Sequence, residues 1–116
     1  FKKNHIILLS KKDDIKIDLI NIKDAVRAVD FFLSKLIKKE IHHQIINIGS
    51  GKGFKIGKLI ELISNKKNLT IQYFVNKDKK NLIASINLAK KYGWKPKYLL
   101  IDGINEITKK YKKIKE

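Results

Sequence analysis

Hydrophobic and polar positions along the chain follow two spacings, one typical of β-strands and one typical of α-helices. Short apolar or alternating runs predict strands over residues 5–9, 15–22, 44–48 and 70–75. Apolar positions that recur every three or four residues predict helices over residues 24–39, 56–63, 85–93 and 101–114. This order predicts a small layered α/β domain over residues 1–116, with a partly parallel sheet and about four helices.

The ends of the predicted helices carry residues that start and stop helices. Asp24 is placed to cap the first helix, and Ser85 is placed to cap the third. Gly93 ends the third helix, because glycine readily adopts the left-handed backbone that terminates a helix. Trp94, the sole tryptophan, follows directly. We expect its ring to be buried and to hold this turn in place.

A glycine-rich turn, Gly49–Gly53, separates the third predicted strand from the second predicted helix. In this context backbone amides and a helix N-terminus can bind an anion. The turn departs from the G-x-G-x-x-G pattern because Phe54 occupies the third glycine position. It departs from the G-x-x-x-x-G-K-[ST] pattern because Leu59 stands where Ser or Thr is needed. We therefore interpret this segment as a plain strand-to-helix turn, not a cofactor phosphate loop.

The composition fits a globular domain and excludes several classes of protein. The 116 residues are 43% apolar and 33% charged, which is not a disordered balance. No apolar run approaches the length of about 18–20 residues that spans a bilayer, so we expect no membrane span. There is no Cys, which excludes disulfides, thiol nucleophiles and Cys-ligated zinc. The chain begins at Phe1 and contains no Met, so we interpret it as a fragment, a processed product or a recombinant segment.

The net charge of +16 raises the possibility of a small basic α/β module that binds nucleic acid or another polyanion. However, Arg27 is the only arginine, and base recognition relies heavily on the bidentate arginine fork. The lysines occur throughout the chain and do not form one basic arm. The composition therefore favours a solvated lysine surface, with the polyanion module as the alternative.

Two further patterns carry little functional signal. Y-x-x-x-K occurs twice, starting at Tyr73 and at Tyr111, but lysine is so common that about one match is expected by chance. His42 and His43 are adjacent in a predicted loop, with no third ligand at a suitable spacing. We therefore assign no catalytic residue and no metal site to this chain.

Several segments together resemble one enzyme family. Segment 18–28, DLINIKDAVRA, resembles the D-F-I-x-V-x-D-V-A-R-A stretch of NAD-dependent epimerase/dehydratases, the extended short-chain dehydrogenase/reductase family. Segment 46–51, INIGSG, is similar to the family's Y-N-I-G-S-G. Ser85-Ile86-Asn87 is similar to its A-D-x-S, and segment 93–96, GWKP, to its L-G-W-x-P. The order and spacing of these segments across almost the whole chain make the match specific.

The resemblance implies that the chain is the C-terminal, substrate-binding part of a nucleotide-sugar epimerase/dehydratase. The N-terminal Rossmann domain, which in this family carries NAD(P) and the catalytic tyrosine–lysine pair, would then lie upstream of Phe1. We expect this fragment to bind no cofactor and to be inactive alone. The implied reaction is hydride transfer at a sugar carbon, giving epimerisation, dehydration or reduction. The implied setting is cytoplasmic synthesis of sugars for surface polysaccharides.

The resemblance also indicates residues that contact the substrate. The family often has an arginine for the pyrophosphate just before the position of Asp18, where this chain has Ile17. A second family arginine comes from the loop around Asp78, where this chain has only lysines, which bind phosphate as point charges. The substrate-binding candidates are Lys79 and Lys80 first, then Lys77, Asn47 and Ser50.

A final expectation concerns association. By analogy with the family, the helix from Asp24 and the strand at 44–48 would pack onto the Rossmann sheet. Without that sheet they would leave an apolar surface and a strand edge exposed. We therefore expect this fragment to self-associate.

Overall fold

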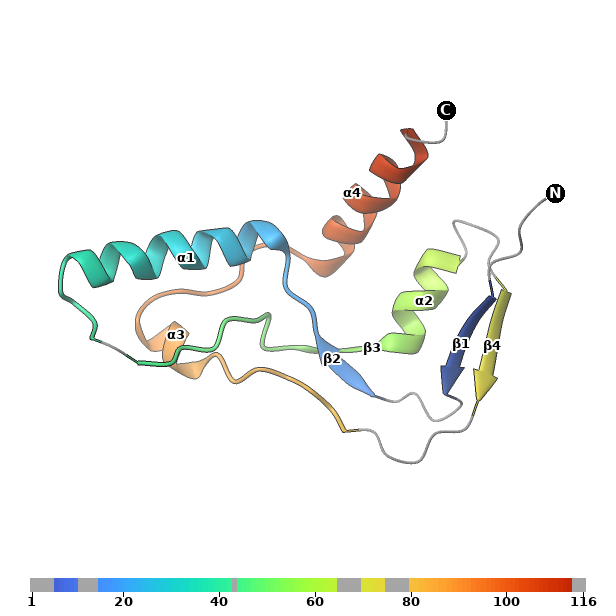
Figure 1. The fold of residues 1–116 in the computed structure, drawn as a ribbon, viewed down its shortest axis with the longest axis horizontal. Coiled ribbons are helices and arrows are strands. Elements are labelled where there is room, and N and C mark those ends of the chain that lie inside the picture. The colour runs from blue at the N-terminus through green and yellow to red at the C-terminus, as the bar shows by residue number, and fades with distance from the viewer. Residues whose placement is uncertain (1–5, 11–14, 43, 65–69, 75–79, 114–116) are drawn as a thin grey trace. The chain divides into compact units, whose positions relative to one another are not determined.

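The chain divides into two compact units, which are described separately. The computed structural model describes residues 6–10, 15–42, 44–64, 70–74 and 80–113. Unit 1 comprises Phe1–Ile17 and Gly53–Leu82, and unit 2 comprises Asp18–Lys52 and Ile83–Glu116. Within the described residues the elements follow one another as β1, β2, α1, β3, α2, β4, α3 and α4 (Figure 1). Strands and helices are thus interspersed along the chain, and the α/β class with four described helices agrees with the sequence-based prediction.

Unit 1 contains a parallel strand pair. β1 (Ile6–Ser10) pairs with β4 (Thr70–Phe74) in a register that runs from Ile6 opposite Thr70 to Ser10 opposite Phe74 (Figure 1). Parallel strands need a long connection, and the chain between β1 and β4 includes α2 (Ile56–Ser64). This helix lies within one residue of its predicted range of 56–63.

A second strand pair joins β2 (Lys16–Asp18) to β3 (Gly53–Lys55), an element that the sequence pattern did not predict. β2 is shorter than the predicted strand at 15–22. Its first residue also binds the segment around Leu82. The Lys16 amide donates to Asn81 Oδ1 at 2.8 Å, and the Leu82 amide donates to the Lys16 carbonyl at 2.9 Å. A parallel bridge between Ile17 and Leu82 extends this contact.

Unit 2 contains α1 (Ile22–Ile37), α3 (Asn87–Lys91) and α4 (Leu100–Lys113), close to the predicted ranges. Both predicted caps are wrong. Asn21 caps α1, because its extended backbone lets the side-chain oxygen accept from the Lys23 amide at 2.9 Å. Asp24 lies inside the first turn of α1, where its carboxylate binds a different segment. α3 begins after Ile86 with no side-chain cap.

The core of unit 2 centres on Trp94, whose exposed fraction is 2%. Two alanines, Ala28 from α1 and Ala89 from α3, pack with it and give the indole ring room. The partly buried residues around them are Ile20, Phe31, Phe32, Ile46 and Ile48. The prediction that Trp94 buries its ring is confirmed. Its Nε1 is buried without a hydrogen-bond partner within the part of the chain that the structure describes.

The segment at 44–48 is not a strand in the structure, although the sequence predicts one. Its burial still alternates as in a strand: Ile46 and Ile48 are partly buried, while Ile45 is 91% exposed and Asn47 is exposed. The physical reason is that none of the strand pairs found among the described residues includes this segment. The alternating pattern of segment 44–48 thus predicts correctly which side chains are exposed and which are partly buried. Among the described residues, however, no neighbouring strand pairs with the segment.

α1 carries apolar residues on two faces. One face is buried and includes Asp24 and Ala28, with Phe31 packed against the core. The other presents an apolar stripe, spaced alternately by four and three residues, that consists of Ile22, Val26, Val29, Leu33 and Leu36. These five side chains are between 44% and 73% exposed. A helix that is apolar on both faces is typical of the interior of a larger assembly.

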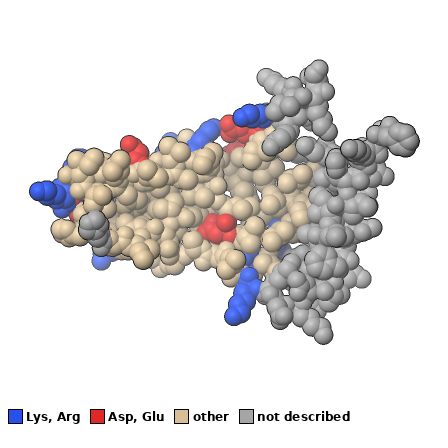
Figure 2. All heavy atoms as spheres, viewed as in Figure 1, with Lys and Arg blue, Asp and Glu red and all other residues tan. Residues whose placement is uncertain are grey.

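Charged groups are sparse on the face that Figure 2 shows. Basic and acidic residues appear there as small separate groups on a mostly uncharged described surface. No described helix is both long enough and apolar enough to cross a membrane.

Candidate functional site

The carboxylate of Asp18, at the end of β2, accepts hydrogen bonds from two other segments of unit 2. Its Oδ1 accepts hydrogen bonds from the Ser50 amide at 2.8 Å and from the Ser50 hydroxyl. Its Oδ2 accepts from the Gly51 amide at 2.9 Å and from the Ala84 amide at 3.2 Å. The glycine-rich turn therefore does bind an anion, and that anion is a side chain of the same chain. We call this group, Asp18 with Ser50, Gly51 and Ala84, the Asp18 clasp.

The glycines of the turn make this approach possible. A Cβ on Gly49 would lie 2.7 Å from Asp18 Oδ2 and 2.9 Å from the Ala84 Cβ, closer than real Cβ contacts. Gly51 has φ of +68°, a conformation that L side chains rarely adopt, and a Cβ there would meet the Ile86 side chain at 2.8 Å. The spacing of these two glycines is therefore explained by the carboxylate and by Ile86.

The environment of Asp18 stabilises its charged form. Burial by itself raises the pKa of this carboxyl, but the opposing hydrogen bonds prevail and hold the pKa below the ordinary value of 3.8. The largest of these contributions comes from the Ser50 hydroxyl, followed by the amides of Ser50, Gly51 and Ala84. Hydrogen bonds to a carboxylate lower its pKa because they stabilise the charge.

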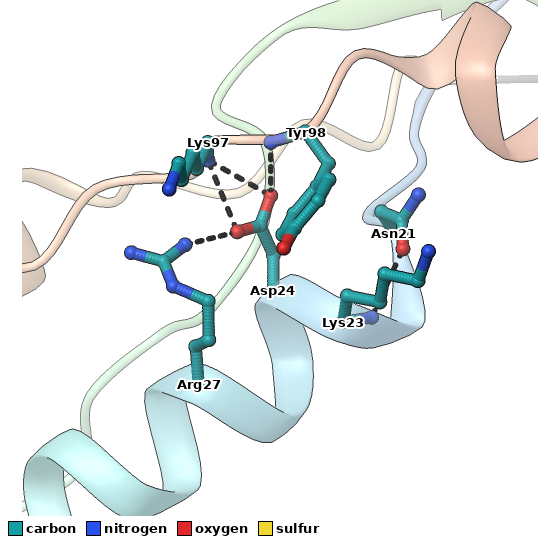
Figure 3. Close-up of polar contacts among 6 residues, drawn as sticks. All are labelled: Asn21, Lys23, Asp24, Arg27, Lys97 and Tyr98. Atoms are coloured by element: carbon teal, nitrogen blue, oxygen red, sulfur yellow. Dashed lines mark hydrogen bonds and ion pairs between the residues drawn. The ribbon is translucent and has the colours of Figure 1, made fainter.

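A second carboxylate, that of Asp24, joins the start of α1 to the chain before α4 (Figure 3). It is fully buried and accepts from the Lys97 amide at 2.9 and 3.0 Å and from the Tyr98 amide at 2.9 Å. Arg27, one turn further along α1, donates to the same carboxylate through Nη1. This arrangement satisfies a buried charge with three donor groups and fixes the segment after Pro96, so its role is structural.

The candidates from the sequence lie in different parts of the structure. Lys80 is exposed in unit 1, whereas Asn47 is exposed and Ser50 partly buried in unit 2. The Ser50 hydroxyl donates to Asp18 and to the Lys52 carbonyl at 3.1 Å. Lys77 and Lys79 lie outside the described residues. Contact between any of these residues and a substrate remains a prediction.

The remaining motifs gain no support as reactive sites. His42 is exposed, and His43 lies outside the described residues. Among the residues that the structure describes, no group of three or more His, Cys, Asp or Glu could hold a metal ion. Both Y-x-x-x-K matches end on lysines outside the described residues, so the structure places neither pair.

The sequence-based reasoning missed the role of Asp18. It weighed the turn as a phosphate loop against a plain turn, and did not consider that a carboxylate of the same chain could bind its amides. The signal was present as an aspartate within the predicted strand at 15–22 and as a Gly-Ser-Gly sequence. These two segments are separated by 32 residues, so their pairing required the fold.

Comparison with known proteins finds chains that are similar to this one in fold and in sequence. Pal from Bacillus thuringiensis superposes with a TM-score of 0.74 at 26% identity, over 96% of this chain and 36% of that one. A GDP-mannoheptose C4 reductase from Campylobacter jejuni, solved with NADP bound, superposes with a TM-score of 0.72 at 19% identity, over 93% and 35%. In sequence, dTDP-4-dehydro-6-deoxyglucose reductase from Escherichia coli is 33% identical over 116 residues, covering 89% of this chain and 36% of that protein.

The resemblance to the extended short-chain dehydrogenase/reductase family is thereby confirmed. The chain spans about a third of the length of the relatives that it matches. No family model matches it. In this family context, the segments around Asp18 and Gly49–Gly51 that carried the resemblance are the ones that the structure brings together in the Asp18 clasp.

Proposed function

We propose that this chain is the C-terminal, substrate-binding part of a nucleotide-sugar reductase of the extended short-chain dehydrogenase/reductase family. The observation that carries the proposal is the 33% identity, over 89% of the chain, with a reductase that acts on a dTDP-linked dehydro-deoxy sugar. The likeness of fold to a GDP-mannoheptose C4 reductase supports it. Epimerisation and dehydration, which the family resemblance also implied, remain predictions, as do the cytoplasmic location and the polysaccharide setting.

In the proposed reaction a reduced nicotinamide cofactor gives a hydride to the carbonyl carbon of the sugar, and the oxygen takes a proton. The carbonyl is reduced to an alcohol as the cofactor is oxidised. A solved neighbour holds NADP, which supports NAD(P) as the cofactor of the whole enzyme. At the glycine turn, the amides of Ser50 and Gly51 already bind a carboxylate, so they are not available to a dinucleotide phosphate. That negative charge would repel a phosphate at the turn.

The role that we propose for this chain is to bind the diphosphate of the sugar nucleotide. Lysines are the cations available in the segment that leads into Asn81, namely Lys77, Lys79 and Lys80. The exposure of Lys80 supports such a role. Arg27, the only arginine, already pairs through Nη1 with the buried Asp24 carboxylate, so the proposal assigns the phosphate contacts to lysines. Asn47 and Ser50 complete the proposed set.

We also propose that the missing partner of α1 and of segment 44–48 is the N-terminal Rossmann domain of the same enzyme. The apolar stripe of α1 and the 91% exposure of Ile45 support this assignment. So does the strand-like burial of segment 44–48 without a paired neighbour among the described strands. In isolation, the same surfaces would bind one another, which would give the self-association expected from the sequence.

The test uses the natural full-length protein that contains this chain. We would follow NAD(P)H oxidation with dTDP- and GDP-linked keto sugars, and compare Lys79→Ala/Lys80→Ala with Lys91→Ala, an exposed lysine in the last turn of α3. Loss of phosphate contacts should raise the KM for the sugar nucleotide about tenfold in the double variant and less than twofold in the control. Absence of NAD(P)H oxidation with every sugar nucleotide would refute the proposed function.

The alternative, a module that binds polyanions, is weakened by the same ion pair. The single arginine already pairs with Asp24, and almost all other cations of the chain are lysines, which lack the bidentate fork used in base recognition. A mixed-sequence oligonucleotide titrated at low salt tests this alternative, since low salt favours electrostatic binding most. We expect no measurable binding under these conditions.

A further inference from the structure

The Asp18 clasp lies wholly within unit 2, and its donors come from two separate segments. The amides of Ser50 and Gly51 and the Ser50 hydroxyl belong to the glycine turn, and the Ala84 amide belongs to the segment before α3. Successive backbone amides that point toward one anion form a concave site of the kind that binds oxyanions in many proteins. In this chain the site holds the carboxylate of Asp18.

The donors of the clasp are held in place by contacts that do not involve the carboxylate. The Lys52 amide donates to the Ser50 hydroxyl oxygen at 3.2 Å, which closes the turn on itself. Gly51 lies against Ile86, so that a Cβ on this glycine would lie 2.8 Å from Ile86 Cδ1. Ile86 is only 3% exposed, so this contact ties the turn to the interior of unit 2. The amides therefore keep their directions when the side chain of Asp18 is shortened.

The shape of the site fits a flat anion with two oxygens. Oδ1 accepts from the amide and the hydroxyl of Ser50, and Oδ2 accepts from the amides of Gly51 and Ala84. A Cβ on Gly49 would lie 2.7 Å from Oδ2 and 3.2 Å from Cγ, so the backbone of this glycine lies directly against the carboxylate. A third oxygen on this side would collide with it. The site therefore favours a carboxylate over a tetrahedral phosphate.

The clasp is also open to ions from the solvent. Gly51 is exposed, and three residues of the clasp are only partly buried, namely Asp18, Ser50 and Ala84. The carboxylate of Asp24, by contrast, accepts backbone amides at a fully buried position. Of these two carboxylates, that of Asp18 is the one that a free anion could replace.

We propose that the clasp is a preformed binding site for small carboxylates such as formate and acetate, with the side chain of Asp18 as its built-in occupant. This side chain beyond Cα has the heavy atoms of acetate, so Asp18→Gly empties the site and leaves a hole of matching size. In the unsubstituted protein the tethered carboxylate excludes free ones, because its effective concentration is far higher. This inference does not use the substrate of the proposed enzyme.

The physical basis of the test is the cost of donors that lack an acceptor. Asp18→Gly leaves three amides and a hydroxyl without the carboxylate, which destabilises the folded state. A free carboxylate that binds the folded state alone restores these bonds and stabilises the fold in proportion to its occupancy.

The experiment uses the natural full-length protein with three sets of substitutions. Asp18→Gly empties the site, and Asp18→Gly/Ser50→Ala also removes the hydroxyl donor. The matched control, Asp30→Ala, removes an exposed carboxylate from α1. Melting temperatures are measured at pH 7 in the sodium salts of formate, acetate, phosphate and chloride at equal ionic strength. Hydrogen exchange at the amides of Gly51 and Ala84 reports on the site itself.

Formate and acetate at about 100 mM should each raise the melting temperature of Asp18→Gly by about 4 °C relative to chloride. They should slow exchange at Gly51 and Ala84 about tenfold in this variant. Phosphate should have no more effect than chloride. The unsubstituted protein and Asp30→Ala should not distinguish the carboxylates from chloride. In Asp18→Gly/Ser50→Ala the dissociation constant for formate should be about tenfold higher, because one donor is lost.

The inference is overturned if formate and acetate protect Asp18→Gly no better than chloride does, or if they protect Asp30→Ala equally. Equal protection by phosphate would show that the site does not select a flat anion, and would also overturn it. Should Asp18→Gly be unfolded in chloride, refolding in acetate decides. Recovery of the folded protein in acetate alone supports the proposal, and recovery in neither salt refutes it.

Discussion

The carboxylate of Asp24 and the guanidinium of Arg27 form an ion pair one turn apart on α1, and only the carboxylate is fully buried. The side chain of Arg27 remains 41% exposed. The pair is therefore asymmetric: Asp24 depends on its donors to be tolerated in the interior, whereas Arg27 keeps much of its hydration. The backbone amides of Lys97 and Tyr98 also donate hydrogen bonds to the Asp24 carboxylate, as Figure 3 shows.

This asymmetry predicts unequal effects for the two partners. Asp24→Ala should lower the free energy of unfolding by about 3 kcal/mol, because it leaves two amides and part of a guanidinium without their acceptor. Arg27→Ala should cost only about 1 kcal/mol, since an exposed partner contributes little and the amides still bind Asp24. Urea unfolding of both variants measures the difference. Equal losses would show that the guanidinium, and not the amides, compensates the buried charge.

Stability should depend on Asp18 in acid. Its pKa is lowered in the folded state, so its contribution is complete above the ordinary value of 3.8 and is lost as the pH falls through the folded value. The difference in unfolding free energy between the unsubstituted protein and Asp18→Asn should therefore be constant above pH 5 and shrink below about pH 4. Urea unfolding at a series of pH values measures it. A difference that grows on acidification would contradict the assigned hydrogen bonds.

Two glycines with positive φ offer a matched comparison. Gly93 has φ of +98°, and a Cβ there would lie 3.8 Å from the Phe31 ring, an ordinary contact. Gly93→Ala should cost about 1 kcal/mol, the usual penalty for a left-handed L residue. Gly51→Ala adds a clash with Ile86, so it should cost about 2 to 3 kcal/mol. Thermal unfolding of the two variants compares them, and a smaller loss for Gly51→Ala would mean that Ile86 moves freely.

The apolar stripe of α1 should drive self-association of the isolated chain. Val26→Lys/Val29→Lys places two charges in the stripe, where the original side chains are 61% and 68% exposed. Sedimentation at high concentration should show oligomers of the unsubstituted chain and monomers of the variant, with little change in melting temperature. A chain that sediments as a strict monomer before any substitution would rule out this association.

The sequence was sufficient for those features that depend on spacing along the chain. The helical ranges and the burial of Trp94 follow from local periodicity and from the size of the ring, and the structure agrees with both. Segment 44–48 is a case in which the spacing of apolar residues was not sufficient to predict the structure. Its alternation is correct, but a strand also needs a paired neighbour, and an alternating pattern does not say whether one is present.

The caps and the clasp depended on contacts between distant residues. The sequence predicted Asp24 as the cap of α1, but Asn21 caps the helix and the Asp24 carboxylate binds the amides of Lys97 and Tyr98 instead. The role of Ser50 likewise depended on a contact with a distant residue. Its residue type is suited to contact a ligand, but its hydroxyl is bound by an aspartate 32 residues earlier. Local sequence propensity does not distinguish such alternatives, because the contacts that distinguish them join residues that are far apart in the sequence.

The single tryptophan gives the molecule a built-in optical reporter. Because the indole of Trp94 is buried with Ala28 and Ala89, we expect its emission at short wavelength while unit 2 is folded and at longer wavelength once water reaches the ring. No second tryptophan contributes to the signal of this chain. The fluorescence of the isolated chain therefore follows the melting of unit 2 alone, and a mismatch with circular dichroism, which records every helix, would reveal how independently unit 1 unfolds.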